Sequence, residues 1–304
     1  MLQNASAKVS EAKKDFGVWA FLPVTDGTFV KTRPSLALSS GALQGKRILA
    51  GNNANEGVPL SPPTAITVED FKSYIRTTFP SFSNRDISDL LSQYAFPGDT
   101  QPTDPKAPKY ETPGNSKTPN AKHQGAFGTG QQQRVFNVFA EYAFDCPSYW
   151  QASAFPQAWK YQFSFPPNFH GGDLPAYWST QNPSAPGKGI KRAVQKIWGN
   201  FIVNNNPIIS TTDAKGGMGN ATVPEGRGGL IDWPVWNEWN PTLLNLNTTG
   251  GTPRTAVVNQ YLSITSYLEP GVTNQFSIAD ARKWEDGRGD RCAWWKRMAA
   301  KVPY

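Results

Sequence analysis

The sequence contains two histidines, His123 and His170, so any histidine-dependent reaction would have to use one of them. His123 lies in a polar stretch, where we expect a solvated side chain. His170 follows the apolar, alternating segment 159–165 and precedes Gly171 and Gly172, which allow the backbone to turn tightly. Imidazole is the side chain best suited to proton transfer near neutral pH. If the chain takes part in catalysis, we therefore expect His170 to be its general base.

Glu56 is the carboxylate that best fits as a partner for His170. It follows the apolar segment 46–51, which is bounded by glycine and predicts a buried parallel strand. In one class of α/β enzymes with a serine nucleophile, the serine, the acid and the histidine follow one another in that order along the chain, and Glu56 precedes His170 as that order requires. A carboxylate near a strand end can also be there only for solvation, so the chemistry alone leaves both interpretations open.

The nucleophile of such a triad is not evident. The chain has no Gly-x-Ser-x-Gly pentapeptide, the motif that exposes a reactive serine on a sharp turn. Ser39, in Ala-Leu-Ser-Ser-Gly at 37–41, comes nearest, but no buried strand precedes it. We therefore expect Ser39 not to be a nucleophile and assign none within this chain.

Strands and helices alternate along the chain, which predicts a layered α/β fold. Capping-box patterns at Thr67/Asp70 and Ser83/Asp86 predict the starts of two helices. The segment 97–130 is rich in Pro, Gly, Thr and Lys and predicts a long loop or a flexible insertion. The remaining predictions are strands at 46–51 and 159–165, helices at 131–144, 190–203 and around Cys292–Met298, and mostly irregular structure over 204–251.

Composition excludes several classes of function. The net charge is +7, but the basic residues are scattered and interrupted by acids, which argues against a nucleic-acid-binding surface. No segment approaches the length of a membrane span. No metal-ligand spacing, phosphate loop or dinucleotide fingerprint is present, so we expect neither a metal nor a cofactor.

Cysteines and glycosylation sequons bear on the compartment. Cys146 and Cys292 are either two buried thiols or one long-range disulfide. Sequons begin at Asn4, Asn220 and Asn247 and favour a secreted glycoprotein. The first residues, however, lack the basic and apolar regions of a signal peptide. The sequence therefore has extracellular character without a visible export signal.

Short motifs spread over nearly the whole chain resemble, in the same order, those of one enzyme family. They are the strand-turn Phe21–Gly27, the acid loop Asn52–Gly57, the cysteine segments Asp145–Pro147 and Arg291–Cys292, the histidine loop Phe169–Asp173 and the helix segment Trp198–Phe201. The family is that of the type-B carboxylesterases, which includes the cholinesterases and fungal lipases. The resemblance implies an α/β-hydrolase fold and hydrolysis of carboxylic esters through an acyl-enzyme.

The resemblance also implies roles for individual residues. Glu56 and His170 would be the acid and the histidine of the triad, with Glu56 fixing the tautomer of the imidazole. Cys146 and Cys292 would form the family's C-terminal disulfide. Asp173 would anchor the histidine loop, although a plain surface carboxylate fits equally well. Trp19 lies in the segment that shapes the acyl pocket of relatives, and it would be either a substrate contact or a core tryptophan.

Relatives carry the serine elbow and the oxyanion-hole glycines upstream of the acid loop. The resemblance therefore implies that residues 1–304 are the C-terminal half of one type-B domain, with an incomplete sheet and helices on both faces. We expect the signal peptide of a secreted, extracellular parent enzyme to lie in the missing half. The chain alone should be inactive and poorly stable, and should act on a carboxylic ester or lipid only when joined to that half.

Two other functions fit parts of the sequence. A cholinesterase-like module that has lost catalysis and serves in binding or adhesion would share this fold, but the presence of both Glu56 and His170 argues against it. A tryptophan-rich carbohydrate-binding protein is suggested only by composition, with 11 Trp. Arg288-Gly289-Asp290 spells an integrin-attachment tripeptide, which we expect to be incidental.

Overall fold

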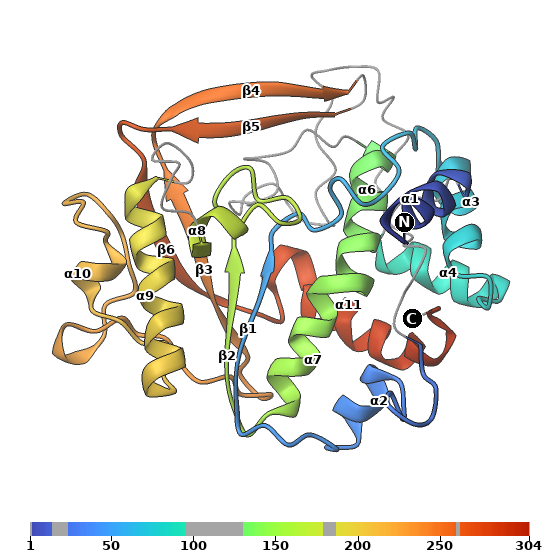
Figure 1. Cartoon of the computed structure of the whole chain (residues 1–304), viewed down its shortest axis with the longest axis horizontal. Helices are drawn as coiled ribbons and strands as arrows, with labels where there is room; N and C mark the ends of the chain where they lie inside the picture. The colour runs from blue at the N-terminus through green and yellow to red at the C-terminus, as the bar shows by residue number, and fades with distance from the viewer. Residues whose placement is uncertain (1, 14–23, 95–129, 179–186, 260–261, 304) are drawn as a thin grey trace.

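The chain forms a four-stranded mixed sheet within the residues that the computed structural model describes, 2–13, 24–94, 130–178, 187–259 and 262–303. The strand order is β1-β2-β3-β6, in which β1, β2 and β3 are parallel and β6 is antiparallel to β3 (Figure 1). A separate antiparallel hairpin, β4-β5, lies at one end of the molecule. The strands are β1 (Arg47–Asn53), β2 (Gln157–Phe163), β3 (Thr242–Thr249), β4 (Thr252–Asn259), β5 (Leu262–Leu268) and β6 (Thr273–Asp280).

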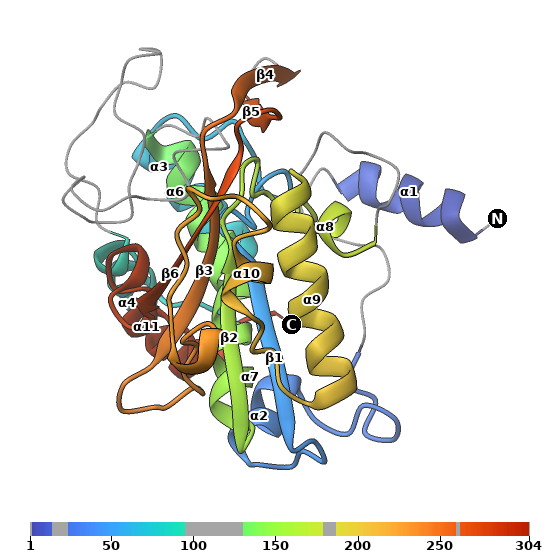
Figure 2. The ribbon, with the colours of Figure 1, turned by 90° about the vertical axis from the view of Figure 1, so that its left-hand side faces the viewer.

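Helices cover both faces of the main sheet, so the predicted α/β fold is confirmed (Figure 2). One face is covered by α3 (Val68–Thr78), α4 (Asn84–Gln93), α6 (Gly130–Ala140), the π-helix η1 (Glu141–Asp145), α7 (Cys146–Ala154) and α11 (Trp284–Met298). The other is covered by α8 (Leu174–Trp178), α9 (Lys188–Asn204) and α10 (Thr211–Ala214). Outside these layers lie α1 (Leu2–Lys13), α2 (Pro34–Ser39) and the 3-10 turns η2 (Arg227–Gly229) and η3 (Ala299–Lys301).

Both predicted capping boxes are present and start their helices at the expected residues. The Thr67 hydroxyl accepts a hydrogen bond from the Asp70 amide at 3.1 Å, and the Asp70 carboxylate accepts one from the Thr67 amide at 2.8 Å. Ser83 and Asp86 repeat the arrangement at the start of α4. Each cap satisfies backbone donors that the first turn leaves open and contributes about 1 kcal/mol.

Strand β2 is buried on both faces, although its alternating sequence predicts only one buried face. Trp159 and Phe163 pack in the apolar core beneath α9. Lys160 and Gln162 are also fully buried, on the face covered by α7 and α11. The Lys160 ammonium donates to Asn52 Oδ1, and its burial lowers the Lys160 pKa to about 7. The alternation therefore separates an apolar interior from a polar interior, and not the core from solvent.

The prediction of irregular structure over 204–251 is wrong at its end, where β3 occupies residues 242–249 in the middle of the sheet. Asparagines make this strand hard to recognise, because Asn is depleted in strands. Here Asn245 and Asn247 are both buried. They alternate with Leu244 and Leu246, which belong to the core beneath α9.

The helix predicted at 131–144 continues further than expected. After α6 the chain forms η1, in which the Cys146 amide donates to the Glu141 carbonyl five residues back, and α7 then runs to Ala154. Pro147 does not stop the helix, and it stands directly after the π-helical turn that the bond from the Cys146 amide to the Glu141 carbonyl closes. The predicted loop at 97–130 lies almost entirely outside the described residues.

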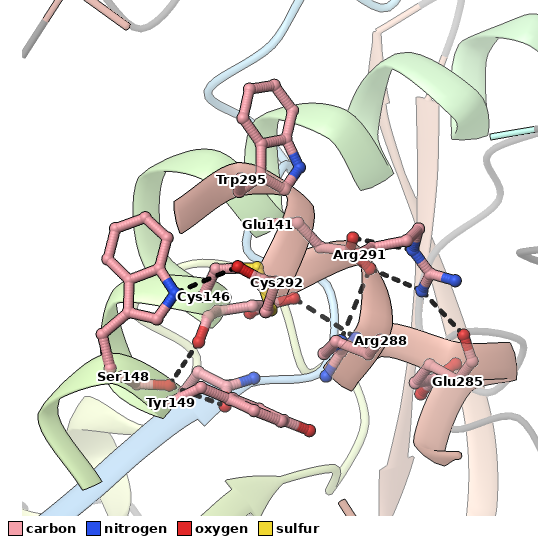
Figure 3. Close-up of a disulfide and its surroundings, with 12 residues drawn as sticks. Glu141, Cys146, Ser148, Tyr149, Glu285, Arg288, Arg291, Cys292 and Trp295 are labelled. Carbon is pink, nitrogen blue, oxygen red and sulfur yellow. Dashed lines mark hydrogen bonds and ion pairs between the residues drawn. A yellow bond between two sulfur atoms is a disulfide. The ribbon is translucent and has the colours of Figure 1, made fainter. Parts of the chain in front are cut away.

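A disulfide and buried ion pairs connect α7 and η1 to α11 (Figure 3). Cys146 and Cys292 are bonded, which confirms the implied pairing. Arg291 holds Glu141 with two hydrogen bonds, Nη2 to Oε1 at 2.7 Å and Nε to Oε2 at 2.8 Å. Arg288 is fully buried, with Nη2 3.2 Å from an oxygen of Asp145. Because Arg288 cannot reach a partner protein, the Arg-Gly-Asp tripeptide is incidental, as expected.

Candidate active site

The candidate site lies where two neighbouring parallel strands end. β1 and β2 run side by side in the same direction, so the loops that follow them emerge at the same edge of the sheet. Backbone hydrogen bonds join these loops: the Asn55 amide donates to the Asn168 carbonyl at 2.9 Å, and the His170 amide donates to the Val58 carbonyl at 2.9 Å. Asn55 and Phe169 also form an isolated parallel bridge. The two loops are therefore fixed to each other by backbone contacts.

These contacts bring the predicted acid and histidine together. His170 Nδ1 lies 2.7 Å from Glu56 Oε2. The Glu56 side chain is 6% exposed, whereas the His170 side chain is 37% exposed. The hydrogen bond to Glu56 raises the pKa of His170 above its ordinary value of 6.5, against the opposing effect of burial. With Nδ1 bonded to a buried carboxylate, the second ring nitrogen remains available for a proton outside the pair.

Two glycines let the loops of Glu56 and His170 adopt their observed paths. A Cβ atom at Gly57 would lie 2.1 Å from the carbonyl oxygen of Phe136 in α6, so no larger residue fits beside the helix. Gly171 has φ +78°, a left-handed conformation that glycine adopts without strain. The turn at Gly171 directs the chain from His170 back toward α8, as the sequence predicts for the glycines after the histidine.

Asn53 binds the carboxylate of Glu56, and Asp173 binds Asn53. Asn53, the last residue of β1, donates to Glu56 Oε1 from its backbone amide at 2.5 Å and from its side-chain Nδ2 at 3.1 Å. The same Nδ2 donates to Asp173 Oδ1 at 3.0 Å. Asp173 also accepts from the Tyr177 hydroxyl at 2.9 Å, and that hydroxyl lies 2.9 Å from the hydroxyl of Tyr161 in β2. Neither Asn53 nor Tyr177 was predicted as a site residue from the sequence.

An aromatic residue on the π-helix contacts the histidine. The Phe144 ring lies with its centroid 4.6 Å from that of His170, at an interplanar angle of 39°. Phe144 also lines a cavity of about 390 Å³ between α2, η1, α7 and the end of α11. Its lining is largely apolar and includes Leu38, Leu60, Phe139, Trp150 and Val302.

The remaining predicted residues lie away from this pair or outside the described residues. Ser39 is the last residue of the six-residue helix α2, where its hydroxyl donates to the Ser35 carbonyl at 2.8 Å. It does not lie on a strand-turn-helix elbow, as expected. Trp19 and His123 fall outside the described residues.

The three sequons have different environments. Asn4 and Asn220 are exposed. Asn247 is 6% exposed within β3, and its Oδ1 accepts a hydrogen bond from the Thr248 amide at 2.8 Å. A glycan on Asn247 would have to occupy the interior, so the structure argues against glycosylation there. Glycosylation at Asn4 and Asn220 stays a prediction.

The described residues show neither a metal site nor a membrane-spanning helix. Among the described residues, no group of three or more His, Cys, Asp or Glu side chains is arranged to hold a metal ion. Within the same part of the chain, none of the helices is both long and apolar enough to cross a bilayer.

Comparisons with known proteins place the fold. No protein-family model matches the sequence. The chain is 22% identical over 217 residues to Secreted lipase 4 of Gibberella zeae, an alignment that covers 68% of this chain and 35% of the lipase. Its structure is similar to the crystal structure of Aspergillus niger EstA, with a TM-score of 0.59 and 16% identity, over 94% of this chain and 46% of EstA. The chain thus shares an α/β fold with EstA and spans less than half the length of each protein.

Proposed function

We propose that this chain contributes the acid and the histidine of a carboxylic ester hydrolase with a Ser-Glu-His mechanism. The observation that carries the proposal is the contact of 2.7 Å between His170 Nδ1 and the buried carboxylate of Glu56. The similarity to a secreted lipase supports ester hydrolysis as the reaction. A serine from outside residues 1–304 would complete the triad. The parent enzyme would be extracellular.

The geometry suits the two proton transfers of this mechanism. Glu56 holds the Nδ1 proton, so the unprotonated Nε2 can take the proton of a serine hydroxyl as its oxygen attacks the ester carbonyl. The imidazolium then returns that proton to the leaving alcohol as the carbon–oxygen bond of the ester breaks. Water repeats the sequence on the acyl-enzyme and releases the carboxylic acid. The buried Glu56 stabilises the imidazolium in both halves of the reaction.

The open edge of the sheet is where the nucleophile would join. β1 is the edge strand of the described sheet, and its middle is Ile48-Leu49-Ala50-Gly51, an apolar sequence typical of an interior parallel strand. A strand added parallel to β1 would end at the same edge as the loops of Glu56 and His170. A serine on the turn after such a strand would therefore reach the site.

The cavity beside Phe144 favours a substrate with an apolar acyl group. Phe144 both contacts the His170 ring and lines the cavity, so an apolar group in the cavity would lie close to the reacting centre. Pockets of a few hundred Å³ with apolar walls are usual for small ligands. We propose esters of apolar carboxylic acids, including lipids, as the substrate class.

The test is a chimera that supplies the missing partner. The chain would be fused behind the part of the Gibberella zeae lipase that precedes its matched region, and hydrolysis of p-nitrophenyl butyrate and labelling by a fluorophosphonate would be measured. We expect the chain alone to show neither activity. In the chimera, His170→Ala should lower kcat/KM by about 10⁴-fold or more, and Glu56→Gln by about 10⁴-fold.

The matched control is His123→Ala, which removes the other histidine of this chain and should leave the rate unchanged. A chimera that hydrolyses the ester equally well with and without His170 would overturn the proposal. If the chimera does not fold, the pKa of His170 in the chain alone tests whether Glu56 and His170 form a pair, which the proposal requires. Glu56→Gln must then lower that pKa, because the replaced carboxylate is its main cause of elevation.

A further inference from the structure

We infer that Asn53 is a positioning residue for the acid of the proposed triad, because its side-chain amide bridges two carboxylates and fixes the one that faces His170. The inference rests on the proposed function and adds a residue to it. Asn53 is a positioning residue and not a catalytic one, because its donated hydrogen bonds go to Glu56 and Asp173 and it acts on His170 through Glu56.

Asn53 fixes Glu56 from two directions. The backbone amide and the side-chain Nδ2 of Asn53 both donate to Oε1 of Glu56. These two bonds occupy one carboxylate oxygen, so the other oxygen, Oε2, is left facing His170 Nδ1. If the histidine were its only partner, the carboxylate could rotate about the bond that joins it to the rest of the side chain. With Oε1 held by Asn53, the orientation that serves His170 is the preferred one.

The orientation of the Asn53 amide is itself determined by its surroundings. Nδ2 lies between two acceptors, 3.1 Å from Glu56 Oε1 and 3.0 Å from Asp173 Oδ1. The opposite orientation would place the amide oxygen between two carboxylates, where only repulsion is available. Asn53 is 3% exposed, and its Oδ1 has no hydrogen-bond partner among the described residues. An unsatisfied buried acceptor costs stability, so the amide is retained for its two donated bonds.

Asp173 makes the arrangement specific to an amide. Two buried or half-buried carboxylates near each other repel, and a neutral donor between them lowers that repulsion without adding charge. A hydroxyl at position 53 could donate to only one of the two, and an aspartate would add a third negative charge. Asp173 is in turn held by Tyr177, so the bridge from β1 reaches α8 through hydrogen bonds alone.

The test measures the pKa of His170 by NMR in the full 304-residue chain, with His123→Gln in the background so that one imidazole titrates. Asn53→Ala should lower the His170 pKa by about half a unit or more, because the side-chain bond to Oε1 is lost and the remaining backbone amide holds the carboxylate less firmly against Nδ1. The matched control is Asn52→Ala: Asn52 is the preceding residue of the same strand and is also buried, but it binds Lys160 on the opposite face. It should leave the pKa of His170 unchanged even if it destabilises the fold.

A second variant covers the case in which Asn53→Ala does not fold. Asn53→Ser keeps a small polar side chain, but its hydroxyl can donate to only one of the two carboxylates that Nδ2 bridges, so it should also lower the pKa of His170 relative to the parent. Equal shifts in the Asn53 and Asn52 variants would overturn the inference. So would an unchanged pKa of His170 in Asn53→Ser.

The outcomes also separate this inference from the proposed function. If Glu56→Gln lowers the His170 pKa but Asn53→Ala does not, the acid–histidine pair stands and only the positioning role fails. If Glu56→Gln has no effect, the pair itself does not exist in solution and both fail.

Discussion

Removal of the disulfide should destabilise the chain by about 5 kcal/mol, relative to the parent, in the free energy of unfolding. Cys146 and Cys292 are 146 residues apart in sequence. In the chain-entropy model a cross-link over a loop of that length removes about 17 cal/mol/K from the entropy of the unfolded chain, or about 5 kcal/mol at 25 °C. Domains have only about 5–15 kcal/mol of stability in total, so the loss would remove a third or more of it.

The assay is equilibrium unfolding in urea, followed by tryptophan fluorescence, of the parent and of the variant Cys146→Ala/Cys292→Ala. The parent treated with dithiothreitol should unfold at the same low urea concentration as the variant, since both lack the cross-link. Ser148→Ala is a matched control, because it removes a small buried polar group from the same helix without affecting the disulfide. A loss below about 1 kcal/mol in the double variant would refute the entropic reasoning.

Three further predictions concern charge and cavity. Arg291→Met should lower the unfolding free energy by about 3–5 kcal/mol in urea titrations, because it leaves the buried Glu141 without its bidentate partner, and a shift below 1 kcal/mol would contradict this. Lys301 lowers the pKa of Asp86 to about 2, so this pair stabilises the fold above about pH 4 and the contribution is lost as the pH falls toward 2. Lys301→Met should therefore reduce the dependence of the unfolding free energy on pH between about 4 and 2. In the active chimera, Ala143→Trp should fill the cavity and lower kcat/KM for p-nitrophenyl dodecanoate about tenfold, while kcat/KM for p-nitrophenyl acetate should not change. Equal effects on both esters would show that the cavity does not bind the acyl group.

The pair of Glu56 and His170 could be predicted because its signals are local. Each residue follows an apolar strand segment and stands beside glycine, and parallel strands bring their following loops to one edge. What the sequence could not give was the distance between them, which depends on the register of β1 against β2. The backbone contacts that join the loops depend on the same register.

Asn53 and Tyr177 were missed for a different reason. Asn53 stands in an asparagine-rich segment whose members look alike in sequence, yet Asn52 faces a buried lysine and Asn53 faces the acid. Only the pleat of β1 decides which of the two neighbours points to the site. Tyr177 contacts the site through Asp173, and nothing in its spacing marks a hydroxyl that reaches back to β2.

Strand β3 shows where propensity fails. Thr-Leu-Leu-Asn-Leu-Asn contains residues that disfavour strands, and its neighbours are rich in Gly, Pro and Asn. Its place between β2 and β6 decides its structure, because β6 pairs with all eight of its residues and β2 pairs with residues 244–246 on the other side. Tertiary context thus overrides a local preference that pointed to irregular structure.

The backbone bonds between the loops of Glu56 and His170 have a mechanical consequence. The amides of Asn55 and His170 donate across the gap in opposite senses, one from each loop. A hinge in either loop would have to break these bonds, so the carboxylate and the imidazole move together as one rigid body. If the proposed triad exists, any gating of its reactivity must then come from how a serine or a substrate approaches this body, and not from assembly or separation of the pair itself.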